Sequence, residues 1–306
     1  MTTDSSKPLD GITPEETTPG DVDDAEIRAA LTSSSPLVRQ RGVEVLDSLA
    51  TQDLDAVDPF LDEVAAAAAD NNVAIALGAI GVLDTIAATD PTRLDGRLDH
   101  LVSVLDTELV DVQLTGGKLL ARLVVEEPDL VSPYVRELVV AIHETEIDEN
   151  PPNFGEVVSD PVTQRTLQEH EQGERERWLS SRRTLVNVVV AVAETDPEAA
   201  ADAVDDLLTL LDDVDPSVAG GAVDALGELA TSHPETVAPV ADRLVGCLNH
   251  SHSLVRARAI RALGYLGDES TVPALREVAK SDNDEDVREL AADTAEFIVE
   301  TAHREN

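Results

Sequence analysis

Residues 253–267 read SLVRARAIRALGYLG, and residues 216–230, thirty-seven positions earlier, read PSVAGGAVDALGELA. Their aliphatic residues fall in matching places, with Val255, Leu263 and Leu266 in the later stretch. Intervals of three and eight residues bring such side chains onto one face of an amphipathic helix. Both stretches are therefore predicted to be helices that turn the same face to a core.

The pattern recurs along the chain with a period of 37 residues and one interruption. The central aliphatic column consists of Leu46, Leu83, Leu120, Val189, Leu226 and Leu263. A preceding helix in each unit opens at Leu61, Leu98, Val135, Val204 and Ala241. A helix hairpin cannot bury both of its faces alone, so the hairpins must stack. We predict an all-α fold, a right-handed α-solenoid of about seven stacked helix hairpins.

Composition limits the class of protein further. The 306 residues include 62 acidic and 22 basic side chains, which gives a formal net charge of −40, and only three of the basic residues are lysine. This balance indicates a halophilic source, because acidic surfaces stay hydrated while molar salt screens their repulsion. Because 42% of the residues are hydrophobic and only 2% are aromatic, we expect an aliphatic helical core. The chain has one cysteine and no apolar run of membrane-spanning length, so we expect a cytoplasmic location.

The interruption of the period indicates an insertion. The column residues Leu120 and Val189 are 69 positions apart, which leaves 32 residues beyond the normal interval. The insertion begins with an irregular acidic loop, residues 146–154, that ends at Phe154. Its second part, residues 162–177, is polar enough to be an exposed helix or disordered, and Trp178 stands at its exit. These aromatics either fold the insertion back onto the solenoid edge or contact a partner. We predict a disordered acidic tail over residues 1–22, the solenoid over residues 23–300, an insertion within the fourth repeat over residues 145–177 and a C-terminal tail over residues 301–306.

The C-terminal third resembles a known repeat family. The residues that carry the resemblance are Val255-Arg256, Ala259, Leu263-Gly264, Pro273, Leu275, Asp284 and Val287-Arg288. They follow the spacing of HEAT-like repeats and look closest to the bilin-lyase-type HEAT subfamily. At the motif arginine position, the middle of the chain carries Ala76, Gln113 and Ala219 instead. The resemblance implies an extended concave surface, lined by the second helices, that holds other proteins and sometimes nucleic acid.

A local cluster of arginines has two interpretations. Arg256, Arg258 and Arg261 follow one another on a predicted second helix. Arg256 shares its repeat position with Arg39, Arg182 and Arg288, which predicts a structural ladder to loop carboxylates or helix carbonyls. In the alternative, the three arginines form an electropositive strip that grips an acidic protein segment or a phosphate.

Few residues suggest chemistry. Cys247, His250 and His252 lie within six residues, yet no fourth metal ligand is evident and Cys247 occupies an apolar column. The pairs His143-Glu144 and His170-Glu171 resemble those of HEAT-repeat deoxyhypusine hydroxylases, which need four such pairs. We therefore expect no catalytic residue, no cofactor and no metal.

These observations favour a non-enzymatic scaffold or adaptor. We expect it to bind a protein of unknown identity through the concave face and the repeat-four insertion, with Arg256, Arg258, Arg261, Phe154 and Trp178 as partner-binding residues. The alternatives are a lyase-like HEAT enzyme, an enzyme-assembly factor or a nucleic-acid-associated HEAT protein. Direct nucleic-acid binding is disfavoured, because a charge of −40 removes the counterion-release contribution to affinity. We expect a monomer or weak oligomer that does not bind membranes.

Overall fold

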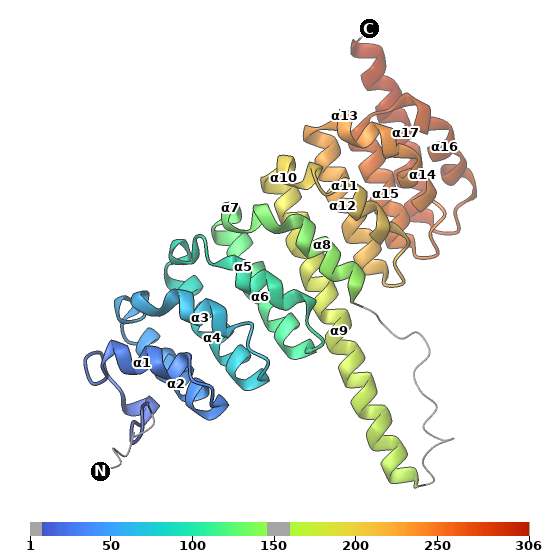
Figure 1. Cartoon of the computed structure of the whole chain (residues 1–306). Helices are drawn as coiled ribbons and strands as arrows, with labels where there is room; N and C mark the ends of the chain where they lie inside the picture. The colour runs from blue at the N-terminus through green and yellow to red at the C-terminus, as the bar shows by residue number, and fades with distance from the viewer. Residues whose placement is uncertain (1–7, 146–159, 306) are drawn as a thin grey trace, which may run out of the picture. The chain divides into compact units, whose positions relative to one another are not determined.

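The computed structural model describes residues 8–145 and 160–305, and the regular structure in these ranges is entirely helical. Contacts divide the chain into two compact units. Unit 1 contains Met1–Val131 and Glu149–Ser181, and unit 2 contains Ser132–Asp148 and Arg182–Asn306. In each unit, helix pairs stack one after another (Figure 1). The predicted fold class is confirmed, since the chain is an all-α solenoid.

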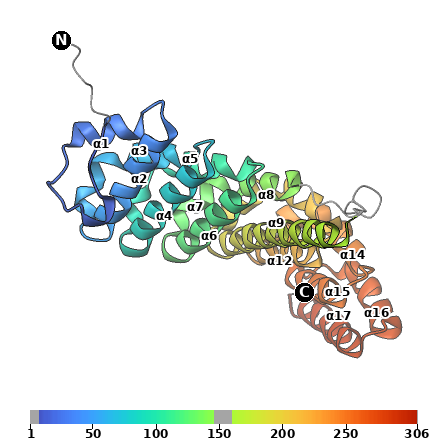
Figure 2. The ribbon, with the colours of Figure 1, turned by 90° about the horizontal axis from the view of Figure 1, so that it is seen from below.

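Unit 1 consists of two layers of helices. The first helices α1, α3 and α5 form one layer and the second helices α2, α4 and α6 the other, with neighbours in contact (Figure 2). The bounds are α1 (Asp24–Leu31), α2 (Pro36–Ala50), α3 (Leu61–Ala67), α4 (Val73–Thr89), α5 (Leu98–Ser103), α6 (Val110–Glu126) and α7 (Pro128–Val131). Short 3-10 helices cover Pro14–Glu16, Leu54–Ala56, Asp58–Phe60, Pro91–Leu94 and Val104–Asp106. The predicted column residues Leu46, Leu83 and Leu120 are buried in the second layer.

The segment before α1 lies against unit 1. Leu9 is fully buried, and its backbone N–H donates to Oε1 of Glu26 over 2.8 Å. Nη1 of Arg41 donates to the Leu9 carbonyl over 3.2 Å. The structure therefore differs, from Pro8 onward, from the disordered tail expected over residues 1–22. The physical reason is that the end of the stack buries the apolar side chain of Leu9. Residues 1–7 lie outside the described part.

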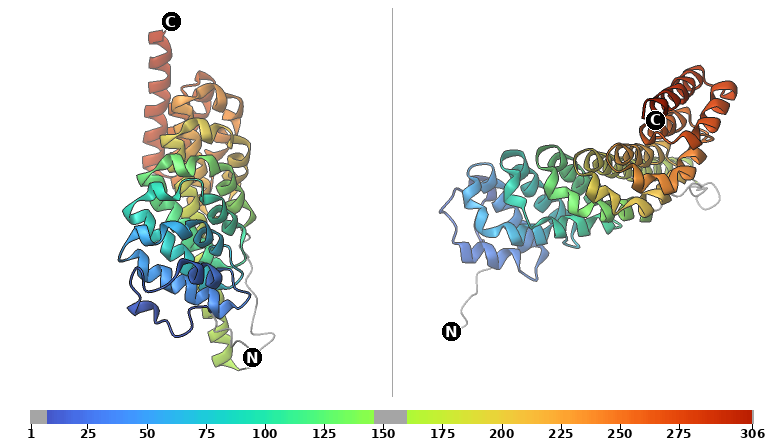
Figure 3. Two further views of the ribbon diagram at one scale, coloured as in Figure 1. Left: turned by 60° about the vertical axis from the view of Figure 1, so that its left-hand side comes forward. Right: turned by 90° about the horizontal axis from the view of Figure 1, so that it is seen from above.

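Unit 2 repeats the two-layer arrangement. Its first helices include α8, α11, α14 and α16, and its second helices are the end of α9 with α12, α15 and α17. The α12–α15, α15–α17 and α16–α17 pairs are in contact, and Figure 3 shows the C-terminal helices in red packed together. The bounds are α8 (Val135–Glu144), α9 (Pro161–Thr195), α10 (Pro197–Ala201), α11 (Val204–Leu207), α12 (Pro216–Ser232), α13 (Pro234–Val237), α14 (Ala241–Cys247), α15 (Ser253–Leu266), α16 (Val272–Ser281) and α17 (Glu285–Glu305). Its short 3-10 helices are Ser132–Tyr134, Leu208–Asp212, Ala238–Val240 and Glu269–Thr271.

The register predicted for the first helices is confirmed. The helices α3, α5, α8, α11 and α14 begin at Leu61, Leu98, Val135, Val204 and Ala241. Local capping supports the second helices. The side chain of Asn72 accepts from the Ala74 N–H at the start of α4, and that of Asp215 accepts from the Ser217 N–H at the start of α12.

Helix α9 contains the described part of the predicted insertion. It is continuous from Pro161 to Thr195, and no side chain of residues 160–180 is buried. Burial begins at Ser181, where α9 becomes the second helix of its repeat. The structure thus selects the exposed helix of the two alternatives for this part, while residues 146–159, with Phe154, lie outside the described ranges. Among the described helices, none has both the length and the apolar character required to cross a membrane.

Candidate functional site

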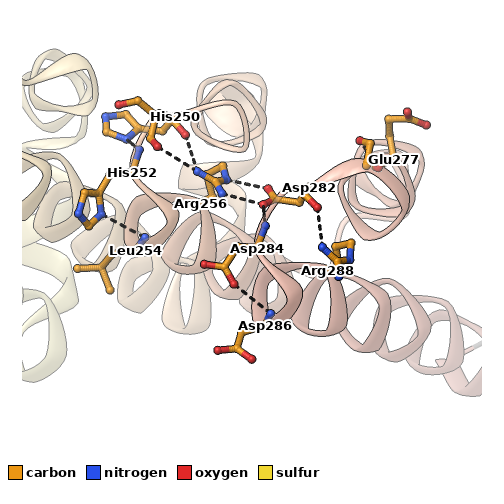
Figure 4. A network of polar contacts seen from close by, with 11 residues as sticks. His250, His252, Leu254, Arg256, Glu277, Asp282, Asp284, Asp286 and Arg288 are labelled. Atoms are coloured by element: carbon orange, nitrogen blue, oxygen red, sulfur yellow. Dashed lines mark hydrogen bonds and ion pairs between the residues drawn. The ribbon is translucent and has the colours of Figure 1, made fainter.

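The first predicted site residue, Arg256, belongs to a structural ladder at the loop edge of unit 2. Its Nε and Nη2 atoms each donate to a carboxylate oxygen of Asp282 over 2.7 Å, and Nη1 donates to the His250 carbonyl over 2.9 Å (Figure 4). Both side chains are nearly covered, with 12% of Arg256 and 7% of Asp282 exposed. This bidentate, shielded pair confirms the ladder interpretation for Arg256.

The same arrangement occurs at Arg39 and Arg182, whereas Arg288, on the last helix, donates through Nη1 to the Asp282 carbonyl over 2.8 Å. Arg39 donates through Nε to Asp70 over 2.6 Å and through Nη1 to the Ser33 carbonyl. Arg182 pairs with Asp213 through both Nη atoms and donates through Nε to the Ile142 carbonyl. Arg39 and Arg182 therefore each link two repeats. On one side the guanidinium group binds a carbonyl of the loop or helix that precedes its own helix, and on the other side it binds an aspartate in the loop of the next repeat. The guanidinium groups also hold the pKa values of the carboxyls of Asp70 and Asp282 below their usual range.

The histidines near Cys247 act as loop caps. His250 and His252 lie 37 positions after Asp213 and Asp215. Nδ1 of His250 accepts from the His252 N–H over 3.1 Å, and Nδ1 of His252 accepts from the Leu254 N–H over 3.3 Å (Figure 4). The two aspartates make the corresponding bonds in their own loop. The histidines thus replace capping carboxylates.

Cys247 does not join these histidines. It is buried in the core, and burial raises the pKa of its thiol to about 11, so the thiolate needed for metal binding is disfavoured. In the described part of the chain, no three histidine, cysteine or acidic side chains are placed to hold a metal ion together. Of the two His-Glu pairs, His143 lies in α8 and His170 on the exposed start of α9, 3.9 Å from Glu174.

An open groove of about 910 Å³ lies between the loops that precede α15 and α17. His250, His252, Arg256, Asp282 and Asp284 line it. Their polar atoms make the capping and ladder bonds of Figure 4, and Asp284 additionally accepts from the Asp286 N–H over 3.1 Å. The groove is consequently an edge of the scaffold whose polar side chains already serve structural contacts.

Arg258 and Arg261 lie apart from this edge and share one carboxylate. Nη1 of Arg258 is 2.8 Å from Oδ2 of Asp224, and Nη2 of Arg261 is 3.5 Å from Oδ1. A cavity of about 180 Å³ beside them is lined by Glu194, Glu228 and Tyr265 among others. The structure therefore brings Arg258 and Arg261 together on α15 and leaves Arg256 at the loop edge.

Electrostatics in this cavity is governed by its acids. Burial raises the pKa of Asp224 above its usual value, while Arg258 and Arg261 act in the opposite direction. Burial, and then the neighbouring Glu194 and Asp224, raise the pKa of Glu228. The carboxyl groups of Asp224, Glu194 and Glu228 thus meet the guanidinium groups of Arg258 and Arg261 at one surface. Only Asp224 is paired with these arginines.

We call the surface formed by the end of α9, α12, α15 and α17 the second-helix face of unit 2. Two exposed aromatic side chains lie on it, Tyr265 at 53% and Phe297 at 58% exposure. They occupy one repeat position, since each follows a buried small residue, Ala259 or Ala291, by six positions. Neither aromatic was predicted from the sequence as a site residue, although the position of each between buried helical residues could have indicated it. Trp178 is half-buried on α9 within unit 1.

Comparisons with known proteins agree with the fold. Residues 204–296 match the family profile described as HEAT repeats. No curated protein sequence matches the chain. A crystal structure of an engineered protein is similar with a TM-score of 0.54 at 19% identity, covering 90% of this chain and 71% of that chain. A designed armadillo repeat protein has a TM-score of 0.47 at 16% identity, covering 79% of this chain and 98% of that chain. At such identities, the likeness concerns the fold alone.

Proposed function

We propose that this protein is a non-enzymatic scaffold that binds another protein through the second-helix face of unit 2. The observation that carries the proposal is the pair Tyr265 and Phe297, which a chain with only 2% aromatic residues exposes on neighbouring helices. Exposed aromatics in a repeated position are typical of interface anchors, because they bury large areas with little loss of side-chain entropy.

Other predicted site residues enter the proposal with different roles. Arg258 and Arg261 help to form the face, and the half-exposed side chain of Arg261 is proposed to contact the partner. Arg256 supports the loop edge through its pair with Asp282. The insertion, with Phe154 and Trp178, is proposed to contact the same partner, because α9 presents an exposed stretch of helix before its core residues.

The setting of this function is also part of the proposal. The charge of −40 and the scarcity of lysine support a halophilic cytoplasm. The spacing of Val255-Arg256, Ala259 and Leu263-Gly264 supports the bilin-lyase-type HEAT subfamily as the repeat type. Neither consideration implies lyase activity, which a site rather than a repeat type would have to supply.

Affinity capture from the source organism at its own salt tests the scaffold. Four proteins are compared: wild type, Tyr265→Ala/Phe297→Ala, a chain whose residues 146–176 become a short Gly-Ser linker, and a control with Glu235→Gln/Asp242→Asn at exposed positions of α13 and α14. We expect one stoichiometric protein with wild type and control, reduced by both other variants. Capture that neither variant changes would contradict the proposal, and a metal or pigment that co-purifies without protein would favour the enzyme alternative.

A further inference from the structure

We propose that the segment held on the second-helix face of unit 2 is cationic, a stretch of polypeptide whose lysine or arginine side chains pack on Tyr265 and Phe297 and reach Glu194 and Glu228. This inference rests on the proposed function and specifies the partner's chemistry. It differs from an arginine strip that grips acids, because the structure pairs Arg258 and Arg261 within the face itself.

The balance of charge on the face favours a cation. Asp224 is the carboxylate that both Arg258 and Arg261 approach. Among the described residues, Glu194 and Glu228 have no basic group within ion-pair distance, although both line the same cavity. A positively charged side chain entering there would relieve the repulsion among the three carboxylates, whereas an anion would increase it.

The aromatic side chains supply a second, independent feature. A Cβ atom added to Gly227 would lie 3.5 Å from Cδ2 of Tyr265, so the ring extends from α15 over α12 toward Glu228. Phe297 on α17 has Asp293 four residues before it and Glu300, which lies 3.5 Å from Nη2 of Arg304, three residues after it, on the same side of the helix. Aromatic rings bordered by carboxylates are suited to lysine and arginine, which interact with the ring face through cation–π attraction.

Geometry gives the spacing of the two cations. Packed helices such as α15 and α17 lie about 8–10 Å apart, and Tyr265 and Phe297 occupy the same repeat position on them. A polyproline II segment rises about 3.1 Å per residue with three residues per turn, so positions i and i+3 lie on one side about 9 Å apart. The face is therefore suited to basic residues at positions i and i+3.

The test uses three labelled octapeptides of otherwise neutral proline, alanine and serine composition. One has arginines at positions 3 and 6, one at positions 3 and 4, and one has glutamates at positions 3 and 6. Fluorescence anisotropy with the full chain is measured at about 0.2 M and about 2 M KCl, because salt weakens diffuse attraction more than close cation–π contact. We expect the first peptide to bind about 10-fold tighter than the glutamate peptide and several-fold tighter than the adjacent-arginine peptide.

Variants locate the binding. Tyr265→Ala/Phe297→Ala and Glu194→Gln/Glu228→Gln should each weaken binding of the first peptide about 10-fold, while Tyr265→Phe retains it. The control Glu235→Gln/Asp242→Asn removes the same charge from exposed positions of α13 and α14 and should change binding less than about 2-fold. Thermal unfolding of each variant verifies that the fold persists.

Several results would overturn the inference. Equal weakening by the control would show diffuse attraction to an acidic protein. Tighter binding of the glutamate peptide, lost in Arg258→Glu/Arg261→Glu, would show that the partner is acidic and would leave the scaffold proposal standing. If no peptide binds but the captured protein is still lost with Tyr265→Ala/Phe297→Ala, the face binds by another chemistry. Only capture that is indifferent to the face would end both proposals.

Discussion

At the scale of single residues, the arginine ladder consists of arginine–aspartate pairs that join neighbouring repeats. Arg39 and Asp70 are 31 positions apart, as are Arg182 and Asp213, and both pairs form. At two of the three positions where the arginine is absent, the acid 31 positions later is absent too, whereas Gln113 keeps an acid, Glu144. Ala76 is followed 31 positions later by Thr107, and Ala219 is followed 31 positions later by His250. The sequence predicted a structural role for the arginine position, and the shared spacing of 31 residues in these two pairs could also have identified the partner.

The first prediction concerns the shielded pair of Arg256 and Asp282. Arg256→Ala should lower the free energy of unfolding by about 2–3 kcal/mol at pH 7, because it leaves a covered carboxylate without its bidentate donor. The folded-state pKa of Asp282 is lowered, so its stabilising contribution is present above the unfolded pKa of about 3.9 and is lost as pH falls through the folded value.

Denaturant unfolding at pH 7 and at about pH 3 measures this effect, with Arg304→Ala as an exposed control. The difference between wild type and Arg256→Ala should shrink at the lower pH. A destabilisation that does not exceed that of the control would show that the pair contributes nothing.

A second prediction follows from the raised pKa of Glu228. Its folded-state value lies above the unfolded value, so stability is lost as pH rises from the unfolded pKa through the folded one. Glu228→Gln removes the ionised form and should raise Tm at pH 7, with no gain at about pH 3.5, where both states are protonated. Calorimetry at the two pH values measures the shift; an equal gain at both would assign the effect to packing.

The contacts and exposure of the other residues of the candidate site could not be predicted from the sequence. Arg258 and Arg261 were predicted to face a partner, but one sequence cannot show that both turn toward Asp224. The exposure of Tyr265 and Phe297 depends on which side of α15 and α17 the neighbouring helices leave open. Such packing relations are set by the tertiary structure.

At the scale of helices, close approach decides which small residues matter. A Cβ atom at Gly221 would lie 2.6 Å from Cγ2 of Val186, where α12 meets α9, whereas one at Gly246 in α14 would meet no atom within 4 Å. Gly221→Ala should therefore destabilise the protein by about 1–3 kcal/mol through overpacking. Gly246→Ala should stabilise it by about 0.5–1 kcal/mol, because alanine is favoured over glycine within a helix. Thermal unfolding compares the two, and equal effects would contradict this packing.

Helix α9 divides into an exposed part and a core part. Because none of residues 160–180 is buried, replacing residues 146–176 by a Gly-Ser linker should leave Tm nearly unchanged while reducing the helical circular-dichroism signal. A large loss of Tm would show that the segment stabilises the fold. The position of this insertion was predictable from the broken period, but the continuity of its helix with the core part was not, since its sequence is polar and without a helical stripe.

At the scale of the whole molecule, the 37-residue period was enough to predict an all-α solenoid, because each hairpin needs its neighbours to bury its apolar columns. The even spread of acidic residues, by contrast, conceals local sites. A net charge of −40 predicts solubility in salt and repulsion of nucleic acid, but it does not indicate which carboxylates are left outside ion pairs. That required the three-dimensional arrangement of α9, α12 and α15.

A protein partner is proposed to bind the second-helix face of unit 2. Site-specific photo-crosslinking in the source organism tests it most directly, with a photoreactive amino acid placed at Tyr265 in one strain and at the exposed first-helix residue Asp242 in another. We expect one discrete protein adduct from position 265 and none from position 242. Adducts from position 242 alone, or the same mixture from both positions, would contradict it.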